Sequence, residues 1–519
     1  MSIAEKVVTG NDHLQQLGYD HYDLLMRRVA SGFSPVIAVD RKAAKPLHRQ
    51  IYDVYRETIV GRKLLTGQQV PSTRALASEL GISRIPVLNA YSQLLAEGYF
   101  ESRSGSGTFV ASSLPEQLTS CAGPKVSLSK VHSGPRSTSI RSANLPRFKP
   151  APWLYGWGAF SVGQVALDHF PFQIWTALTA RHWRNVHARS LHFSDPMGSE
   201  DFRETIAGYL RTVRAVNCEP RQIMIVSGSQ QALEISARVL LDAGDSVWIE
   251  EPGYRLTQQV LALAGCRVVP VPVDEEGLNV SAGIRLCRKA RAAYVTPSHQ
   301  YPLGATMSAS RRLQLLEWAR TSHSWIIEDD YDSEYRYRDM PIASLQGLDR
   351  GSRVIYIGTF SKTLFPSLRL GYMVIPPDLI DRFVAVRHAM DMYPAHHYQA
   401  VLRDFIAEGH FARHIRRTRL LYSERRGVLV KAIANEFDSR LQVLGAEAGM
   451  HSVVVAQEKI NDREIAARAA SRNLWLWPLS PCYLGKASRH GFVLGFGSTP
   501  AQAIPQAVHQ LRKVLAWNA

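Results

Sequence analysis

Residues 354–364 read Val-Ile-Tyr-Ile-Gly-Thr-Phe-Ser-Lys-Thr-Leu. The first four residues are apolar and have the length of a β-strand that is buried on both faces. Similar short runs occur earlier in the chain, separated by stretches in which apolar residues recur at helical spacing. These runs are residues 223–226, 247–249, 268–269, 292–295 and 325–327. Alternation of buried strands with helices predicts an α/β domain with a mostly parallel sheet covered on both sides.

The residues that follow two of these runs are suited to a ligand with a phosphate group and a flat ring. Such a sheet binds its ligand at the carboxyl ends of the strands. Ser227-Gly228-Ser229-Gln230 opens a predicted helix, and free amides at a helix start attract an anion such as phosphate. Tyr254 follows the run at 247–249 and presents an aromatic plane. A plain strand-to-helix turn and core packing would explain the same residues equally well.

Four carboxylates follow the run at 325–327, in the sequence Glu328-Asp329-Asp330-Tyr331-Asp332. Burying an ionised carboxylate is expensive without a partner. A metal ion would be one such partner and a cationic ring another. No metal site is expected, because no histidine or further acidic cluster stands nearby in the sequence to complete a ligand set.

Lys362 stands among hydroxyl residues directly after the run at 354–357, and Arg369 follows seven residues later. Desolvation at the end of a buried strand would lower the pKa of this lysine and prepare it for amine chemistry. A lysine on a solvated loop is the ordinary alternative. Together, the motifs that follow the four runs at 223–226, 247–249, 325–327 and 354–357 indicate a ligand site more specifically than any one motif does.

From residue 156 onward, these motifs and their order resemble a fold-type I aminotransferase that uses pyridoxal 5'-phosphate. The resemblance implies that Lys362 is the Schiff-base lysine, that Asp329 pairs with the pyridinium nitrogen, and that Tyr331 hydrogen-bonds the ring oxygen. It implies that Tyr254 stacks on the ring. The implied phosphate-binding residues are Gly228, Ser229, Gln230, Thr359 or Ser361, and Arg369. A carboxylate opposite the ring nitrogen keeps that nitrogen protonated, which makes the cofactor an electron sink.

Three departures from the aminotransferase pattern weaken the expectation of efficient turnover. His299-Gln300-Tyr301-Pro302-Leu303-Gly304 replaces the usual Asn-Pro-Thr-Gly. Phe193 stands where many relatives supply a phosphate-binding tyrosine from the partner subunit, and Val493 stands where they place the arginine for a substrate carboxylate. Arg489 is a possible substitute for that arginine.

Residues 46–110 predict a separate unit with three helices and a hairpin. Leu47, Ile51, Val54, Tyr55 and Ile59 recur at helical spacing. A second helix begins after Ser72, and a third begins after Ser83 with Pro86 in its first turn. A hairpin with a Gly105-Ser106-Gly107 tip follows. This order predicts a winged helix-turn-helix that places a helix in the DNA major groove; a three-helix protein-contact module is the alternative.

The same stretch resembles the GntR-type winged helix of bacterial repressors along its whole length. The match rests on Pro71-Ser72-Thr73-Arg74, Ser83-Arg84 and the glycine-rich wing. The resemblance implies that Arg74 and Arg84 contact DNA. The full expected DNA-binding set is Ser72, Thr73, Arg74, Ser83, Arg84, Gly105, Ser106 and Gly107. The usual Asn-Thr after Ser-Arg is replaced by Ile85-Pro86, so the operator preference does not carry over.

Length and composition agree with this division into domains. A chain of 519 residues is too long for one core. The expected parts are an N-terminal extension (1–39), a winged helix (40–111), a linker (112–152) and an aminotransferase-like domain (153–519) whose small α+β domain spans about 390–519. The net charge of +16 makes a polyanion partner plausible. No apolar run is long enough for a membrane helix, and five scattered cysteines fit a reducing cytosol.

The complete order of domains is similar to the MocR/GabR group of bacterial transcriptional regulators. This resemblance implies a cytoplasmic, domain-swapped homodimer that binds a double-stranded DNA operator. It also implies that a small amine, or the cofactor itself, is sensed through the Schiff base (aldimine) of Lys362. An active pyridoxal-phosphate-dependent transaminase fused to a DNA-binding module is the alternative. A cofactor domain with only a structural role is a third possibility.

Overall fold

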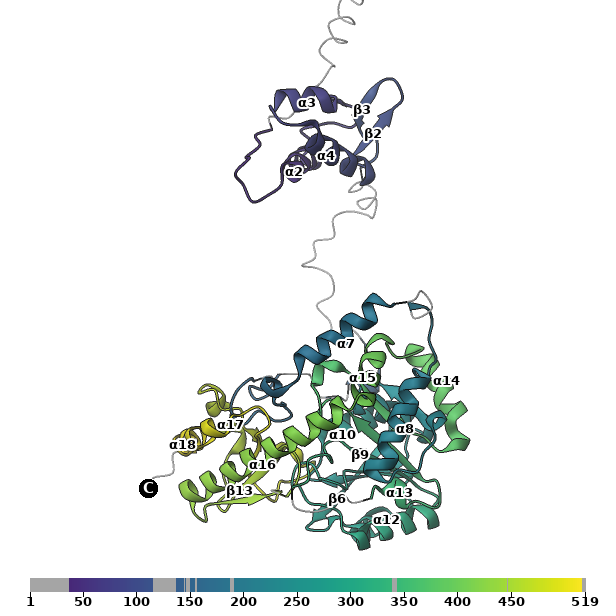
Figure 1. Ribbon diagram of the computed structural model, residues 1–519, viewed down its shortest axis with the longest axis vertical. Coiled ribbons are helices and arrows are strands. Elements are labelled where there is room, and N and C mark those ends of the chain that lie inside the picture. The colour runs from purple at the N-terminus through teal and green to yellow at the C-terminus, as the bar shows by residue number, and fades with distance from the viewer. Residues whose placement is uncertain are drawn as a thin grey trace, which may run out of the picture. The chain divides into compact units, whose positions relative to one another are not determined.

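The computed structural model describes residues 37–114, 137–143, 145, 150–154, 156–186, 191–337, 343–445 and 447–515. The chain forms two compact units, Met1–Arg136 and Ser137–Ala519 (Figure 1). The boundary falls within the segment 112–152 that we expected to be a linker. Most of that segment, and residues 1–36 of the expected extension, lie outside the described residues. The two units are therefore described one at a time.

The described part of the first unit, residues 37–114, contains three helices and a small antiparallel sheet with strand order β1-β3-β2. The helices are α2 (Leu47–Val60), α3 (Thr73–Glu79) and α4 (Arg84–Ala96), and the strands are β1 (Gln69–Val70), β2 (Phe100–Arg103) and β3 (Gly107–Val110). The rings of Tyr55, Tyr91 and Phe100 pack edge to face with centroids 5.1–5.6 Å apart. This arrangement confirms the predicted winged helix.

The first turns of α3 and α4 differ in how they are capped. The Ser72 side chain accepts a hydrogen bond from the backbone amide of Ala75 at 3.2 Å, as expected of an N-cap serine. Ser83 occupies the N-cap position of α4, but its side chain makes no capping bond. The Ser83 hydroxyl is exposed and remains accessible to a ligand.

The second unit is built on an eight-stranded sheet with strand order β4-β11-β10-β9-β8-β5-β6-β7. Its strands are β4 (Ile223–Val226), β5 (Ser246–Glu251), β6 (Arg267–Asp274), β7 (Gly277–Leu278), β8 (Ala292–Val295), β9 (Trp325–Asp330), β10 (Val354–Thr359) and β11 (Gly371–Val374). Strands β6, β5, β8, β9 and β10 are parallel, whereas β11 and β7 run antiparallel to their neighbours. The six predicted strands are present; β7 and β11 were not predicted.

Helices cover both faces of this sheet, because alternate residues of each strand point to opposite sides. On one side, Ile249, Ile327 and Ile357 share a core cluster with residues of α9 (Ser229–Leu240), α10 (Arg255–Leu263) and α14 (Ile380–Asp391). The other side packs on further helices, which are α8 (Glu200–Arg214), α11 (Val280–Cys287), α12 (Ala309–Thr321) and α15 (His397–Ala407). The result is a buried sheet whose strand ends carry the polar residues.

A four-stranded antiparallel sheet with order β12-β13-β15-β14 forms the core of the small domain. Its strands are β12 (Leu441–Leu444), β13 (His451–Ala456), β14 (Trp477–Pro478) and β15 (Gly491–Gly495), and its helices are α16 (His410–Phe437), α17 (Asp462–Ala470) and α18 (Ile504–Leu515). Further helices among the described residues are α6 (Ile140–Ala143), α7 (Phe172–Arg184) and α13 (Leu345–Leu348). In Figure 1 the small domain lies beside the large sheet of the same unit. Helix α6 belongs to this second unit and contacts α10.

The buried ion pair between Arg214 and Asp330 anchors α8 to the end of β9. The two side chains are 2% and 1% exposed and lie 2.7 Å apart. We expect Arg214→Met to destabilise the folded protein by about 3–5 kcal/mol, because it leaves a buried carboxylate without its partner. The exposed pair Arg221–Glu219 provides the control, since Arg221→Met should cost less than about 1 kcal/mol. Urea denaturation measures both, and equal losses would contradict the prediction.

Candidate functional site

All ten residues predicted to bind a cofactor line a single cavity of about 300 Å³ in the second unit. The cavity opens at the carboxyl ends of β4, β5, β9 and β10, where a parallel sheet binds its ligand. These residues are Gly228, Ser229, Gln230, Tyr254, Asp329, Tyr331, Thr359, Ser361, Lys362 and Arg369. Small-domain residues Met450, His451 and Trp477 also line the cavity, so both domains contribute to it.

Lys362 lies just beyond β10 with its amine directed into the cavity. Its Nζ donates to the carbonyl oxygen of Gly163 at 3.4 Å. Burial lowers the pKa of Lys362, although the charges of Asp332 and Asp329 oppose this shift. Gly163 has φ +79°, and a Cβ there would lie 2.4 Å from Nζ. The positive φ favours glycine at this position. The site holds an amine that deprotonates more easily than an ordinary lysine.

Asp329 has one carboxylate oxygen that is bonded and one that is free. Oδ2 accepts a hydrogen bond from the Tyr294 hydroxyl at 2.6 Å, whereas Oδ1 is buried with no hydrogen-bond partner among the described residues. Burial raises the pKa of Asp329 to about 6. A buried acceptor without a partner is costly, and a protonated ring nitrogen would supply the missing donor. The carboxylate therefore fits the pyridinium of pyridoxal 5'-phosphate.

The opposite part of the lining fits a phosphate group. Gly228, with φ +119°, precedes the first turn of α9, and helix starts attract anions. The Thr359 hydroxyl accepts from the Ser361 amide at 3.2 Å and lies 3.1 Å from the Ser361 hydroxyl. A Cβ on Gly228 would lie 3.3 Å from the guanidinium of Arg369. Glycine here leaves room for an anion between the helix start, the hydroxyls and the arginine.

Tyrosines supply the flat walls and a proton donor. The rings of Tyr254 and Tyr301 meet edge to face with centroids 5.7 Å apart. Tyr331 donates to the carbonyl oxygen of His299 at 2.8 Å. Burial keeps the pKa of Tyr331 well above its ordinary value, so its hydroxyl stays protonated and remains a donor.

The fold brings His299 and His451 next to Asp332, one of the four carboxylates that follow the run at 325–327. His299 Nδ1 lies 3.0 Å from Asp332 Oδ2, and the His451 ring centroid lies 4.7 Å from that of His299. The expectation that no histidine stands near these carboxylates is wrong, because chain segments distant in sequence converge here. The three side chains could hold a metal ion. The Asp332 contact and the His451–Pro302 hydrogen bond (3.2 Å) engage one nitrogen of each ring, whereas His299 Nε2 is buried with no hydrogen-bond partner among the described residues.

The departures from the aminotransferase pattern have clear structural positions. Val493 is fully buried in β15 among other small-domain apolar residues. Phe193 is 68% exposed and Arg489 is exposed; neither lines the cavity. Among the described residues, Arg369 is the only arginine in the lining, and it belongs to the phosphate end. Tyr301 is a lining residue that the sequence reading did not assign.

The predicted DNA-binding residues gather on the exposed surface of the first unit. Arg84 Nε donates to the Thr73 hydroxyl at 3.0 Å, which brings the starts of α3 and α4 together. Arg74 and Arg84 are both exposed. The wing glycines Gly105 and Gly107 have φ of +75° and +107°, and Gln69 donates to the Ser106 carbonyl oxygen at 2.7 Å. The wing therefore has a glycine-dependent backbone shape, and Arg74 and Arg84 are exposed on the same unit.

Replacing Asp329 by asparagine is expected to stabilise the cofactor-free protein at high pH. The folded state holds the Asp329 proton more tightly than the unfolded chain, since the pKa rises from 3.8 to about 6. Folding stability is therefore lost as pH rises through this window. Asp329→Asn should gain about 1–3 kcal/mol at pH 8, with a smaller gain at pH 5. The same gain in folding stability at pH 5 and pH 8 would show that the raised pKa of Asp329 is not the cause. Cofactor affinity should fall in the same variant.

Comparison with known proteins defines the class of the chain as a winged-helix DNA-binding domain joined to an aminotransferase fold. Residues 47–110 match the family described as bacterial regulatory proteins, gntR family, and residues 159–491 match aminotransferase class I and II. The kynurenine aminotransferase of Pyrococcus horikoshii is 25% identical with a TM-score of 0.67, covering 73% of this chain and 96% of its own. The aminotransferase LysN of Thermus thermophilus, solved with a phosphopyridoxyl-leucine ligand, has the same identity and TM-score, covering 73% and 97%.

Full-length relatives identify the family. The probable rhizopine catabolism regulatory protein MocR of Rhizobium meliloti is 39% identical over 483 residues, which are 92% of this chain and 95% of the relative. The pyridoxine biosynthesis regulator PdxR of Corynebacterium glutamicum is 32% identical, covering 85% and 90%. The chain therefore belongs to the MocR-type family of DNA-binding transcriptional regulators with a pyridoxal phosphate domain. No described helix is long and apolar enough to cross a membrane.

Proposed function

We propose that this regulator senses a small amine, or pyridoxal 5'-phosphate itself, at Lys362 and thereby changes how it binds operator DNA in the cytoplasm. The observation that carries the proposal is the pairing of a buried amine of lowered pKa with the free oxygen of Asp329 in one cavity. Pyridoxal phosphate supplies an aldehyde that condenses reversibly with amines. Lys362 is the amine of this chain best placed to take that bond.

The residues of the cavity have separate proposed roles. Asp329 would hold the ring nitrogen in its protonated form, and Tyr254 would lie against the ring. The Tyr331 hydroxyl, which donates to the His299 carbonyl oxygen in this structure, would donate to the ring oxygen instead when the cofactor is bound. Gly228, Ser229, Gln230, Thr359, Ser361 and Arg369 would bind the phosphate. Asp332, which is held by His299, would limit how far burial lowers the pKa of Lys362.

Signal transmission is proposed to depend on the two-domain lining of the cavity. Asp329 and Lys362 come from the large domain, whereas His451 and Trp477 come from the small domain. An effector that touches both domains favours the relative position of the two domains in which it makes the most contacts. It shifts the equilibrium between the two positions only by its difference in affinity for them.

We propose a domain-swapped homodimer, because the expected linker of about 40 residues can span on the order of 130 Å. Light scattering of the full-length protein tests the dimer.

The alternative of an active aminotransferase differs in one measurable outcome. The cavity has no second arginine among the described residues for a substrate carboxylate, which favours binding without turnover. The test supplies amino donors and a keto acid acceptor to the cofactor-loaded protein and follows product over time. Absence of sustained amino transfer, together with an amine-dependent change in operator affinity, is expected. Sustained transfer that disappears in Lys362→Ala would favour the enzyme.

A further inference from the structure

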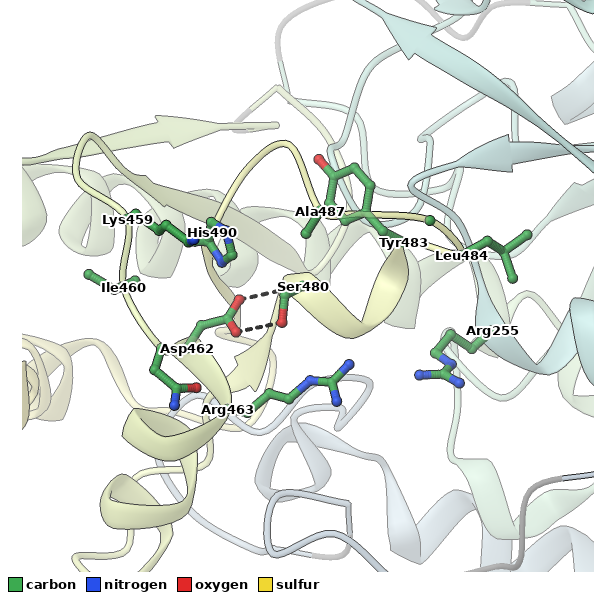
Figure 2. A pocket seen from close by; sticks show the side chains of 12 residues that line it. Arg255, Lys459, Ile460, Asp462, Arg463, Ser480, Tyr483, Leu484, Ala487 and His490 are labelled. Atoms are coloured by element: carbon green, nitrogen blue, oxygen red, sulfur yellow. Dashed lines mark hydrogen bonds between the residues drawn. The ribbon is translucent and has the colours of Figure 1, made fainter.

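A second cavity, of about 640 Å³, lies where the large and small domains meet (Figure 2). Arg255 enters it from the first turn of α10 in the large domain. Lys459 and Arg463 enter it from the small domain, before and within the first turn of α17. The neutral part of the lining includes Tyr483, which is half-buried.

The cavity lining carries more positive than negative side chains, namely three cations and one carboxylate. Arg255, Lys459 and Arg463 are exposed residues, and within the described parts of the chain they form no ion pair and no side-chain hydrogen bond. Asp462 is 1% exposed, and its carboxylate accepts from the Ser480 amide at 2.8 Å and the Ser480 hydroxyl at 2.6 Å. Three cations therefore face a cavity whose one acidic side chain is already hydrogen-bonded.

A second carboxylate beside the cavity wall, that of Glu251, is also hydrogen-bonded. Glu251 accepts hydrogen bonds from the backbone amides of Leu484 and Gly485 at 2.9–3.1 Å. This contact ties the end of β5 to the small-domain loop that forms one wall of the cavity. Glu251 thus fixes the wall and does not pair with the cations.

The two arginines converge although their charges repel. Figure 2 shows the guanidinium of Arg463 extending toward that of Arg255 across the opening. Guanidinium groups bind carboxylates and phosphates through two parallel hydrogen bonds each. Two guanidiniums that face one space, with a lysine nearby, match a small oxyanion with at least two negative charges.

We propose that this cavity is a second ligand site, for a small phosphate or dicarboxylate anion that clamps the large domain against the small domain. It shares a wall with the cofactor cavity. Tyr254 lines the cofactor cavity and the next residue, Arg255, lines this one. The Gly253 amide donates to the Cys482 carbonyl oxygen at 3.0 Å, which joins the two segments that separate the cavities. An anion here favours the same domain arrangement as an effector in the cofactor cavity, and each ligand strengthens binding of the other.

Calorimetric titration of the full-length protein with inorganic phosphate, and separately with succinate, tests the proposal. The ionic strength is held constant with sodium chloride, and the protein is saturated with pyridoxal phosphate so that the first phosphate site is filled. The Arg255→Gln/Arg463→Gln double variant should bind the anion about ten-fold or more weakly, because it loses charge-assisted hydrogen bonds. Arg472→Gln, an exposed small-domain arginine, is the matched control and should bind as the wild type does. The preferred anion distinguishes a phosphate site from a carboxylate site.

Equal affinity of wild type and double variant for both anions would overturn the proposal, as would heat changes that sodium chloride alone reproduces. Loss of operator binding in the double variant, with no anion binding in the wild type, would assign the cations to DNA and also overturn it. Repeating the titration with cofactor-free Arg369→Gln protein separates this site from the first one. If the cofactor-free Arg369→Gln protein still binds the anion, the second site is supported independently of whether Lys362 takes up the cofactor.

Discussion

Lys362→Ala is expected to abolish covalent retention of pyridoxal phosphate and every amine-dependent change in operator affinity. The reason is that Lys362 is the amine that lines the cavity next to Asp329, and burial lowers its pKa. Borohydride reduction followed by mass spectrometry should place the cofactor mass on the peptide with Lys362 in the wild type and nowhere in the variant. Operator affinity without effector should stay close to that of the wild type, because the residues that we expect to bind DNA belong to the other unit.

Lys431→Ala is the control for this experiment, since Lys431 is exposed on α16. It should retain both the trapped cofactor and the effector response. An effector response that survives in Lys362→Ala would contradict the sensing role and would leave the cofactor domain with a structural role only.

Arg84→Ala and Arg74→Ala are each expected to weaken operator binding by about 1–3 kcal/mol. Both arginines are exposed at the starts of α4 and α3, and Arg84 is oriented by its bond to Thr73. Fluorescence anisotropy with labelled operator measures the affinity at several salt concentrations. Wild-type affinity should fall steeply with added salt through counterion release, and a variant that loses one phosphate contact should show a shallower slope.

Arg62→Ala is the matched control, because Arg62 is an exposed arginine of the same unit just beyond α2. It should bind nearly as well as the wild type, and cofactor retention should be unchanged in all three variants. Full affinity of the Arg74→Ala/Arg84→Ala double variant would reject this DNA-binding surface.

The parts of the fold that the sequence predicts are those with strong local signals. Apolar runs such as 223–226 and 354–357 form strands that are buried on both faces. The sequence analysis did not predict β11 (Gly371–Val374), because this strand is short and follows the Lys362 loop with no α-helix in between. The alternation of strand and helix that marks the predicted strands is absent here. Its antiparallel pairing with β10 and β4 depends on contacts that no local pattern reveals.

Some residues of the site could be predicted from local sequence, whereas others are placed there only by contacts between distant parts of the chain. The ten predicted residues follow strand ends, and a parallel sheet brings strand ends together, so spacing alone places them near one another. His451 starts a small-domain strand and reaches the cavity from more than 100 residues beyond the carboxylate cluster. Likewise, Asp332 and His299 each belong to a recognisable sequence motif, but only the fold brings them together, with His299 Nδ1 3.0 Å from Asp332 Oδ2. A signal for His451 is absent from the sequence, because domain packing determines its position.

The most direct test of the account follows the cofactor and the DNA in one sample. Full-length protein with labelled operator is titrated with pyridoxal phosphate and then with candidate amines, while visible absorbance and fluorescence anisotropy are recorded together. If chemistry at Lys362 controls DNA binding, both signals change at the same ligand concentrations in the wild type and neither changes in Lys362→Ala. An anisotropy change without any absorbance change, or cofactor uptake that leaves operator affinity constant for every amine, would contradict the account.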